Sequence, residues 1–232
     1  MYERIIHLIT LFNPRDYLHN YLFNNFNQLS KNDWALLKEK RKNLKPEHKL
    51  ATILQNDDIE ALKSEMIHPD FDIDEIIPES FLEPVWMLQH HPSLIQYAAF
   101  YNAINCFKYL LMSGANLRYV DSVNRTLPQF AVCNGNIEIF RLCQQFCPIQ
   151  GADHTAIAFH QNGLFIWLHE SYNTDLSQVH PQRGSTLSRI MSEWNYEVLF
   201  YVLEKGYDLG FVDTTNVLLY YLCFGFYLEN SS

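Results

Sequence analysis

The sequence predicts an all-α fold in which short helix pairs repeat along the chain, and two observations support this prediction. A segment of eleven residues occurs at Gly114 and again, 92 residues later, at Gly206, and both copies read G-x-[ND]-L-x-[YF]-V-D-[ST]-x-N. The chain also holds only 8 Gly against 15% aromatic residues, whereas strand-rich folds with many tight turns need more Gly. Self-similarity of this kind is typical of repeat architectures.

The residues around this duplication follow the same register. An apolar segment precedes each copy, at Cys106–Ser113 and at Val198–Lys205, and the Gly that comes next is typical of a helix C-cap. A further copy begins at Gln129, 33 residues after Gln96, where Q-F-A-V follows the pattern of Q-Y-A-A. The 92-residue offset therefore predicts two intervening units, one of them with a shortened loop.

Two more segments extend the repeat. Ile53–Lys63 contains N-D-D-I-E, which matches N-G-N-I-E at Asn134–Glu138, and Ala156–Gly163 leads into the apolar Leu164–Leu168. Each unit is a short apolar helix, a polar break, a second apolar helix and a loop. One such pair has too little core to stand alone, so we expect neighbouring units to stack.

These motifs resemble the ankyrin repeat. S-L-I-Q-Y-A-A at Ser93–Ala99 and T-L-P-Q-F-A at Thr126–Ala131 are similar to the ankyrin opening T-P-L-H-x-A, with Gln96 and Gln129 in the place of His. L-L-M-S-G-A-N-L at Leu110–Leu117 resembles L-L-x-x-G-A-D-V. The whole pattern is also similar to the degenerate ankyrin-type domain of unknown function that is expanded in protists such as Trichomonas.

The resemblance covers residues 48–225 and implies an ankyrin-like helical repeat solenoid. We expect an N-terminal helical cap and basic linker at 1–47, followed by about five degenerate repeats at 48–232, the last of them incomplete. The segment 151–184 lacks the hairpin usual in the family.

Composition narrows the class of partner. The 232 residues are 48% hydrophobic and 19% charged, as in a folded globular protein. A net charge of −9 disfavours binding to nucleic acid and to anionic membranes, and no apolar run reaches the ~18 residues of a membrane span. Five Cys without a C-x-x-C pair, and a first segment without the features of a secretory signal, predict reduced thiols in a cytoplasmic protein.

The resemblance implies a non-catalytic module that binds a partner protein through its loop tips and concave face, with no cofactor. The alternative is an adaptor or regulatory subunit that recruits an enzyme through the N-terminal helical segment. For the tip residues Tyr119 and Phe211, packing of loop against loop is an equally good interpretation. The expected contact residues are Tyr97, Phe100, Tyr101, Arg118, Tyr119, Asp121, Phe130, Cys133, Asn134, Phe211 and Asp213.

Other polar clusters favour ordinary structural roles over chemistry. His90-His91 fits no metal-binding helix spacing, and the acidic run Asp70–Glu75 lacks the Gly and distal Glu of a calcium loop. Cys143 and Cys147 lie on one helix face near His154, which suggests a zinc site or a Cys–His dyad, but their apolar flanks favour core thiols.

The cationic segment is the last such cluster. Five of the eight residues from Lys38 to Lys45 are Lys or Arg, and a lipid or RNA contact is the functional interpretation. Acidic neighbours at Glu39 and Glu47 favour a solvated helix face instead.

Overall fold

The computed structural model describes residues 26–28, 30–43, 48–80, 83, 85–172, 176, 179–180 and 184–207. The chain divides into two compact units, Met1–Arg125 and Thr126–Ser232. Phe211 and Asp213 lie outside the described residues, as do the expected helices before Phe26. Of the expected N-terminal cap, helix α3 (Lys31–Asn43) is the largest described part.

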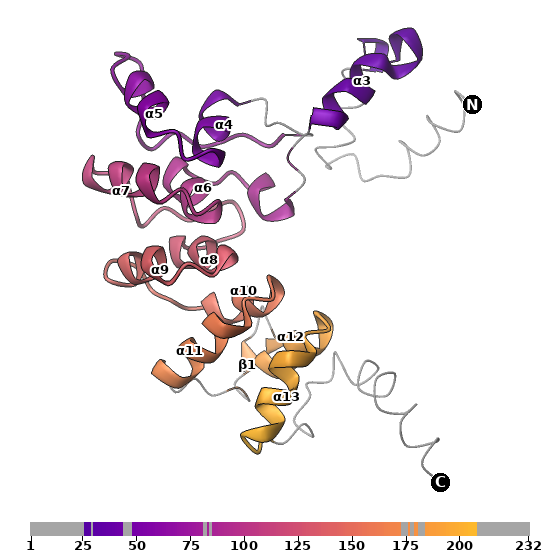
Figure 1. Cartoon of the computed structure of the whole chain (residues 1–232), viewed down its shortest axis with the longest axis vertical. Helices are drawn as coiled ribbons and strands as arrows, with labels where there is room; N and C mark the ends of the chain where they lie inside the picture. The colour runs from indigo at the N-terminus through magenta and orange to yellow at the C-terminus, as the bar shows by residue number, and fades with distance from the viewer. Residues whose placement is uncertain are drawn as a thin grey trace. The chain divides into compact units, whose positions relative to one another are not determined.

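Two helix pairs make up the main part of the first unit (Figure 1). Their first helices, α4 and α6, pack against each other, and so do their second helices, α5 and α7. A 3-10 helix, η1, lies in the loop before α6. The elements are α4 (Lys49–Gln55), α5 (Ile59–Met66), η1 (Trp86–Gln89), α6 (Leu94–Phe100) and α7 (Ile104–Met112).

In the described part of the second unit, three helix pairs follow one another along the chain. The first helix of the middle pair, α10, packs against the first helices of the other two pairs, α8 and α12. The second helices α11 and α13 also pack against each other. The elements are α8 (Leu127–Ala131), η2 (Val132–Asn134), α9 (Ile137–Gln144), α10 (Ala152–Ala158), α11 (Asn162–Tyr172), α12 (Thr186–Ser192) and α13 (Tyr196–Glu204).

The sequence sets the ends of these helices in a regular way. Ser93 and Gln96 form a capping box at the start of α6, and Thr126 and Gln129 form the same box at α8. Between the two helices of each pair, one residue takes a left-handed conformation with φ between 51° and 70°. These turn residues are Asp57, Asn102, Gly135, His160 and Trp194.

The first helices form the core of the stack. All seven residues of α6 are buried, and Ala98, Ala99 and Ala131 are no more than 1% exposed. Small side chains at these positions let neighbouring backbones approach closely, while Phe107 and Phe140 of the second helices fill the space beside them at 1% exposure or less.

A short hairpin precedes α12, which corrects the expectation that 151–184 lacks one. β1 (Val179–His180) pairs antiparallel with β2 (Gly184–Ser185). Two-residue strands leave almost no hydrophobic alternation, so the sequence pattern gives no signal for them. The same segment also contains α10 and α11, a complete helix pair.

Candidate functional site

An exposed tryptophan marks the loop before α6. Trp86 is 65% exposed at the first position of η1, although the next two residues, Met87 and Leu88, are buried. The guanidinium carbon of Arg125 lies 4.9 Å from the centre of the Trp86 ring, and the His90 ring meets it edge-on at 4.7 Å. Arg125 and His90 therefore hold the indole in a fixed position at the surface.

Arg125 is fixed in turn by a buried ion pair. Its Nε donates to Asp121 Oδ2 at 2.6 Å, and its Nη2 donates to the Met87 carbonyl at 2.7 Å. The other oxygen of Asp121 accepts the backbone N–H groups of Val123 at 3.1 Å and Arg125 at 2.7 Å. The carboxylate side chain is fully buried and that of Arg125 is 9% exposed, so this pair is a structural element of the loop.

Further hydrogen bonds fasten the 113–125 loop to the loop that carries Trp86. The Tyr119 hydroxyl donates to the His91 carbonyl at 2.9 Å, and Ser122 donates to the His90 carbonyl from both its backbone N and its hydroxyl at 3.1 Å. The Gln96 amide donates to the Tyr119 carbonyl at 3.0 Å. Two consecutive loops thus become one surface, which we call the loop platform: Trp86, His90, Tyr119, Asp121 and Arg125.

The electrostatics of the loop platform are simple. Burial lowers the pKa of His90, and the nearby Arg125 cation lowers it further. The imidazole is therefore neutral at pH 7, and Arg125 supplies the positive charge beneath the indole. Arg118, Val120 and Val123 stand exposed on the same loop. An exposed tryptophan ring stacked on an arginine combines two residue types that are enriched in protein-binding hot spots.

Behind the platform, a buried glutamate links η1 to α6. Glu83 is 3% exposed and accepts the Tyr97 hydroxyl at 2.7 Å and the Val85 N–H at 3.0 Å. Tyr101 donates to both its oxygens at 3.4 Å. Burial, followed by the Glu83 charge, raises the pKa of Tyr97, and the same two causes raise that of Tyr101 to about 12. Both phenols stay protonated, as donors that satisfy Glu83.

Several predicted contact residues are not where the sequence interpretation placed them. Tyr97, Phe100 and Phe130 are at most 7% exposed, so the expectation that they stand exposed on the first helices is wrong. Asp121 is 3% exposed and holds the loop together. The physical reason is that each first helix is packed on several sides.

Others do reach the surface. Arg118 and Asn134 are exposed, while Tyr101 and Tyr119 are half-buried and hydrogen-bonded. Phe130, Cys133 and Asn134 belong to the second unit, and Cys133 is buried there. For Tyr119 the geometry favours loop packing, since its hydroxyl is used within the platform.

The clusters with possible chemistry have structural roles. Cys143 and Cys147 are 1% and 7% exposed, which confirms them as core thiols, and burial raises the pKa of Cys143. His154 is buried at the third position of α10 and contacts the Thr186 hydroxyl at 3.3 Å. Asp74 accepts the Asn116 N–H at 2.7 Å, which ties two loops together. In the described part of the chain no three His, Cys, Asp or Glu side chains form a metal-binding group.

Sequence reasoning did not identify Trp86 and Arg125. Both lie outside the helical pattern, where periodicity carries no information. The available signal was a tryptophan in a loop between Pro84 and Pro92, a place where a large aromatic has no helix face to bury.

Helix pairs joined by left-handed turns and stacked through their first helices define a helical repeat protein. The chain is similar to a solved human structure, the ASB11 ankyrin repeat domain, with a TM-score of 0.51 and 18% identity over 69% of this chain and 70% of that chain. This likeness concerns the fold, which is all-α and ankyrin-like. No protein-family model and no curated protein matches the chain. None of the helices in the described ranges is long and apolar enough to cross a membrane.

Proposed function

We propose that this protein is a non-catalytic interaction module that binds a partner protein through the loop platform. The observation that carries the proposal is Trp86, which is 65% exposed yet held in place by Arg125 and His90. A fixed aromatic side chain loses little conformational entropy on binding, and tryptophan and arginine are enriched among the residues that dominate interface energies.

The rest of the contact surface follows from the same loops. Tyr119 belongs to the platform, Arg118 precedes it on the same loop, and Asn134 is an exposed candidate in the second unit. Phe211 and Asp213 repeat Tyr119 and Asp121 at the 92-residue offset, and we retain them as predicted residues of an equivalent loop. The ankyrin-type motifs also support placing the chain with the degenerate ankyrin families of protists.

The net charge supports a protein partner, and the buried thiols support a cytoplasmic location. A chain of net charge −9 favours a protein partner over nucleic acid or anionic lipid. Cys106, Cys133, Cys143 and Cys147 are buried thiols, which is consistent with a reducing cytoplasm.

The test is quantitative capture from a cytosolic extract of the source organism, with wild type compared with Trp86→Ala. Loss of a hot-spot side chain costs about 2 kcal/mol or more, so we expect at least one captured protein to fall about 30-fold in affinity. Ile67→Ala is the matched control, because Ile67 is 82% exposed in the same unit and lies outside the platform. Partners retained equally by all three proteins would contradict the proposal, and so would a folded wild type that captures none.

A further inference from the structure

The last described helix, α13, carries two apolar faces. Its buried face consists of Val198, Leu199 and Val202. On another face, Tyr196 is 53%, Phe200 61% and Leu203 38% exposed. These three residues follow the i, i+4, i+7 spacing that puts side chains in one row along a helix. An apolar row of this kind usually contacts another element, and we call it the α13 stripe.

Comparison among the repeats shows that the stripe is not a requirement of the fold. Counted from the turn residue of each pair, Phe200 occupies the position held by Lys63, Lys108 and Arg141 in three of the other four pairs and by the half-buried Ile166 in the fourth. Lys108 and Arg141 are exposed, so the position faces solvent in those two pairs. The large apolar side chain at Phe200 therefore has no role in the repeat's own core.

The turn before α13 also differs from the turns of the other repeats, because it too carries a large apolar side chain. Trp194 takes φ 54° at the position held by Asp57, Asn102, Gly135 and His160. A bulky residue in the left-handed region costs about 1–2 kcal/mol, whereas glycine and asparagine accept it readily. Trp194 is nevertheless 51% exposed, so burial does not offset this cost. A strained and exposed aromatic side chain points to a role in binding.

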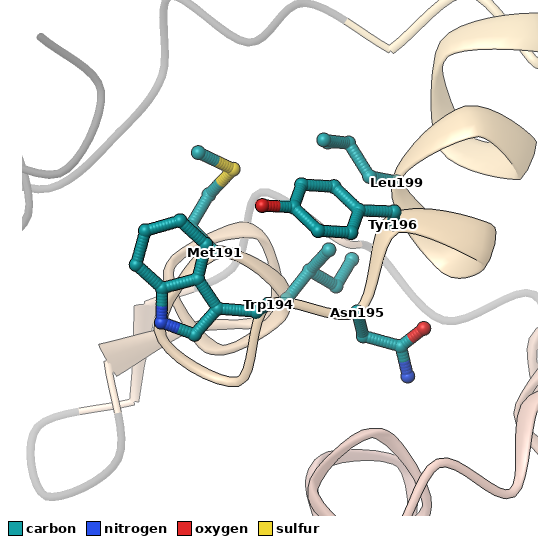
Figure 2. Close-up of a pocket in the computed structure, with 6 residues that line it drawn as sticks. Met191, Trp194, Asn195, Tyr196 and Leu199 are labelled. Carbon is teal, nitrogen blue, oxygen red and sulfur yellow. The ribbon is translucent and has the colours of Figure 1, made fainter. Parts of the chain in front are cut away.

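Trp194 and one residue of the stripe, Tyr196, line a shallow hollow. Figure 2 shows the rings of Trp194 and Tyr196 flanking it, with Met191 and Leu199 beside them and the Asn195 amide pointing away. The two rings lie 6.3 Å apart at 61°. The hollow is too small to enclose a ligand or a whole side chain, so it only adds to the apolar surface beside Tyr196.

One edge of the stripe is acidic. Glu197 and Glu204 follow Tyr196 and Leu203 directly in sequence, which places both on the same side of the row. Both are exposed, and Glu197 is hydrogen-bonded to a neutral group, the Asn162 amide, at 2.7 Å. Among the residues that the structure describes, neither glutamate forms an ion pair, so two negative charges along this edge stay uncompensated.

We infer that the α13 stripe binds an amphipathic helix of a partner protein that presents aliphatic side chains beside a row of Lys or Arg. The aliphatic row would pack along Tyr196, Phe200 and Leu203, and the Trp194 ring beside Tyr196 would extend this contact. The basic row would meet Glu197 and Glu204. Recognition of a helix by an apolar strip with a charged rim is a common mode of peptide binding. This surface shares no residue with the loop platform and is independent of it.

The test uses full-length protein and a fluorescein-labelled helical peptide of about 18 residues, with Leu at i, i+4, i+7 and i+11 and Lys along one edge. A second peptide replaces each Lys by Glu. We expect the Lys peptide to bind about tenfold or more tightly than the Glu peptide in fluorescence anisotropy, because only its charge complements the rim. Raising the salt concentration should narrow this difference.

Phe200→Lys is the decisive variant, since it installs a basic residue, as three of the other four described pairs carry at this position. We expect it to weaken the Lys peptide about tenfold or more, while Phe146→Lys, which changes another half-exposed Phe of the same unit, has no effect. Circular dichroism establishes that both variants are folded.

Three results would overturn the inference. The first is equal binding of the two peptides, which would show unspecific hydrophobic adhesion. The second is binding that Phe200→Lys leaves unchanged. The third is that the stripe binds something other than a partner helix. This result would be a dimer in sedimentation velocity, or binding of the protein to phosphatidylcholine vesicles, that the Phe200→Lys variant no longer shows.

Discussion

The buried pair of Asp121 and Arg125 gives the sharpest test of how the loop platform is held. Asp121→Ala removes three hydrogen-bond acceptor contacts, to Val123 N, Arg125 N and Arg125 Nε, at 3.1, 2.7 and 2.6 Å. It also leaves the guanidinium, whose side chain is 9% exposed, without its counter-ion. Breaking such a pair from one side costs about 3–5 kcal/mol. Because Arg125 keeps the Met87 carbonyl and the Trp86 ring, we expect the lower end, about 3 kcal/mol.

The assay must resolve the first unit from the second. Hydrogen exchange read by mass spectrometry on peptides from α6 and α7, in increasing urea, reports the unfolding of the first unit alone. With a slope of about 2 kcal/mol per molar urea, a loss of 3 kcal/mol lowers the midpoint by about 1.5 M. Asp70→Ala, at an exposed loop position, is the control and should stay within about 0.5 kcal/mol of wild type.

Two further variants test the mechanism. Asp121→Asn keeps an oxygen for the backbone N–H groups but loses the charge, so its cost should fall between wild type and Asp121→Ala. Adding Arg125→Met to Asp121→Ala removes the stranded charge, so the double variant should be no less stable than Asp121→Ala alone. A cost below about 1 kcal/mol for Asp121→Ala, or a large further loss in the double variant, would refute the reasoning.

Three other predictions concern the first unit. Asp57 accepts the backbone N–H groups of Asn105 at 3.2 Å and Cys106 at 2.8 Å, so Asp57→Ala removes the cap of α7 and should cost about 1–2 kcal/mol in urea unfolding, with Asp57→Asn losing less. Burial raises the pKa of Cys106 to about 12, so at pH 8 only about one thiol in 10⁴ is ionised; site-resolved mass spectrometry should find it unmodified by iodoacetamide until the protein unfolds. Burial and Glu83 raise the pKa of Tyr101 to about 12. Since the unfolded phenol ionises near pH 10, its contribution to stability is complete below pH 10 and lost between pH 10 and 12; Tyr101→Phe should reduce this loss, and the part that remains belongs to Tyr97, whose pKa is also raised.

The sequence was sufficient for the helix pairs because their signals are local. The polar residue before α5, α9 and α13 caps that helix with a direct hydrogen bond, and in α9 the Glu138 N–H donates to Asn136 Oδ1 at 2.8 Å. Gln96 and Gln129, predicted to replace the ankyrin His, each close a capping box and donate their amide to the following loop. His154 holds the corresponding position in α10, where H-T-A at His154–Ala156 keeps the H-x-A end of the ankyrin opening without its T-P-L.

Exposure was harder to predict than secondary structure. Leu94–Phe100 reads L-I-Q-Y-A-A-F, which offers no polar face to solvent, and a helix that is apolar all round is buried. Applying that rule would have placed Tyr97 and Phe100 in the core. The position of the Trp86 side chain depends instead on Arg125, which lies 39 positions away in the sequence, and on the loop geometry. A periodic pattern contains no information on either.

In a repeat protein, the residues that recur at the same position in each unit differ from the residues that we expect to bind a partner. A residue type that returns at the same position in several units answers a demand common to all units, as Asp121 does by holding the backbone of its loop. A side chain that breaks the pattern at an exposed position meets no such demand, and if it is large and apolar it lowers solubility without stabilising the fold. Trp86 and Phe200 are residues of this second kind, at 65% and 61% exposure. The positions where the repeats differ, rather than those where they agree, are therefore where binding to other molecules should be sought.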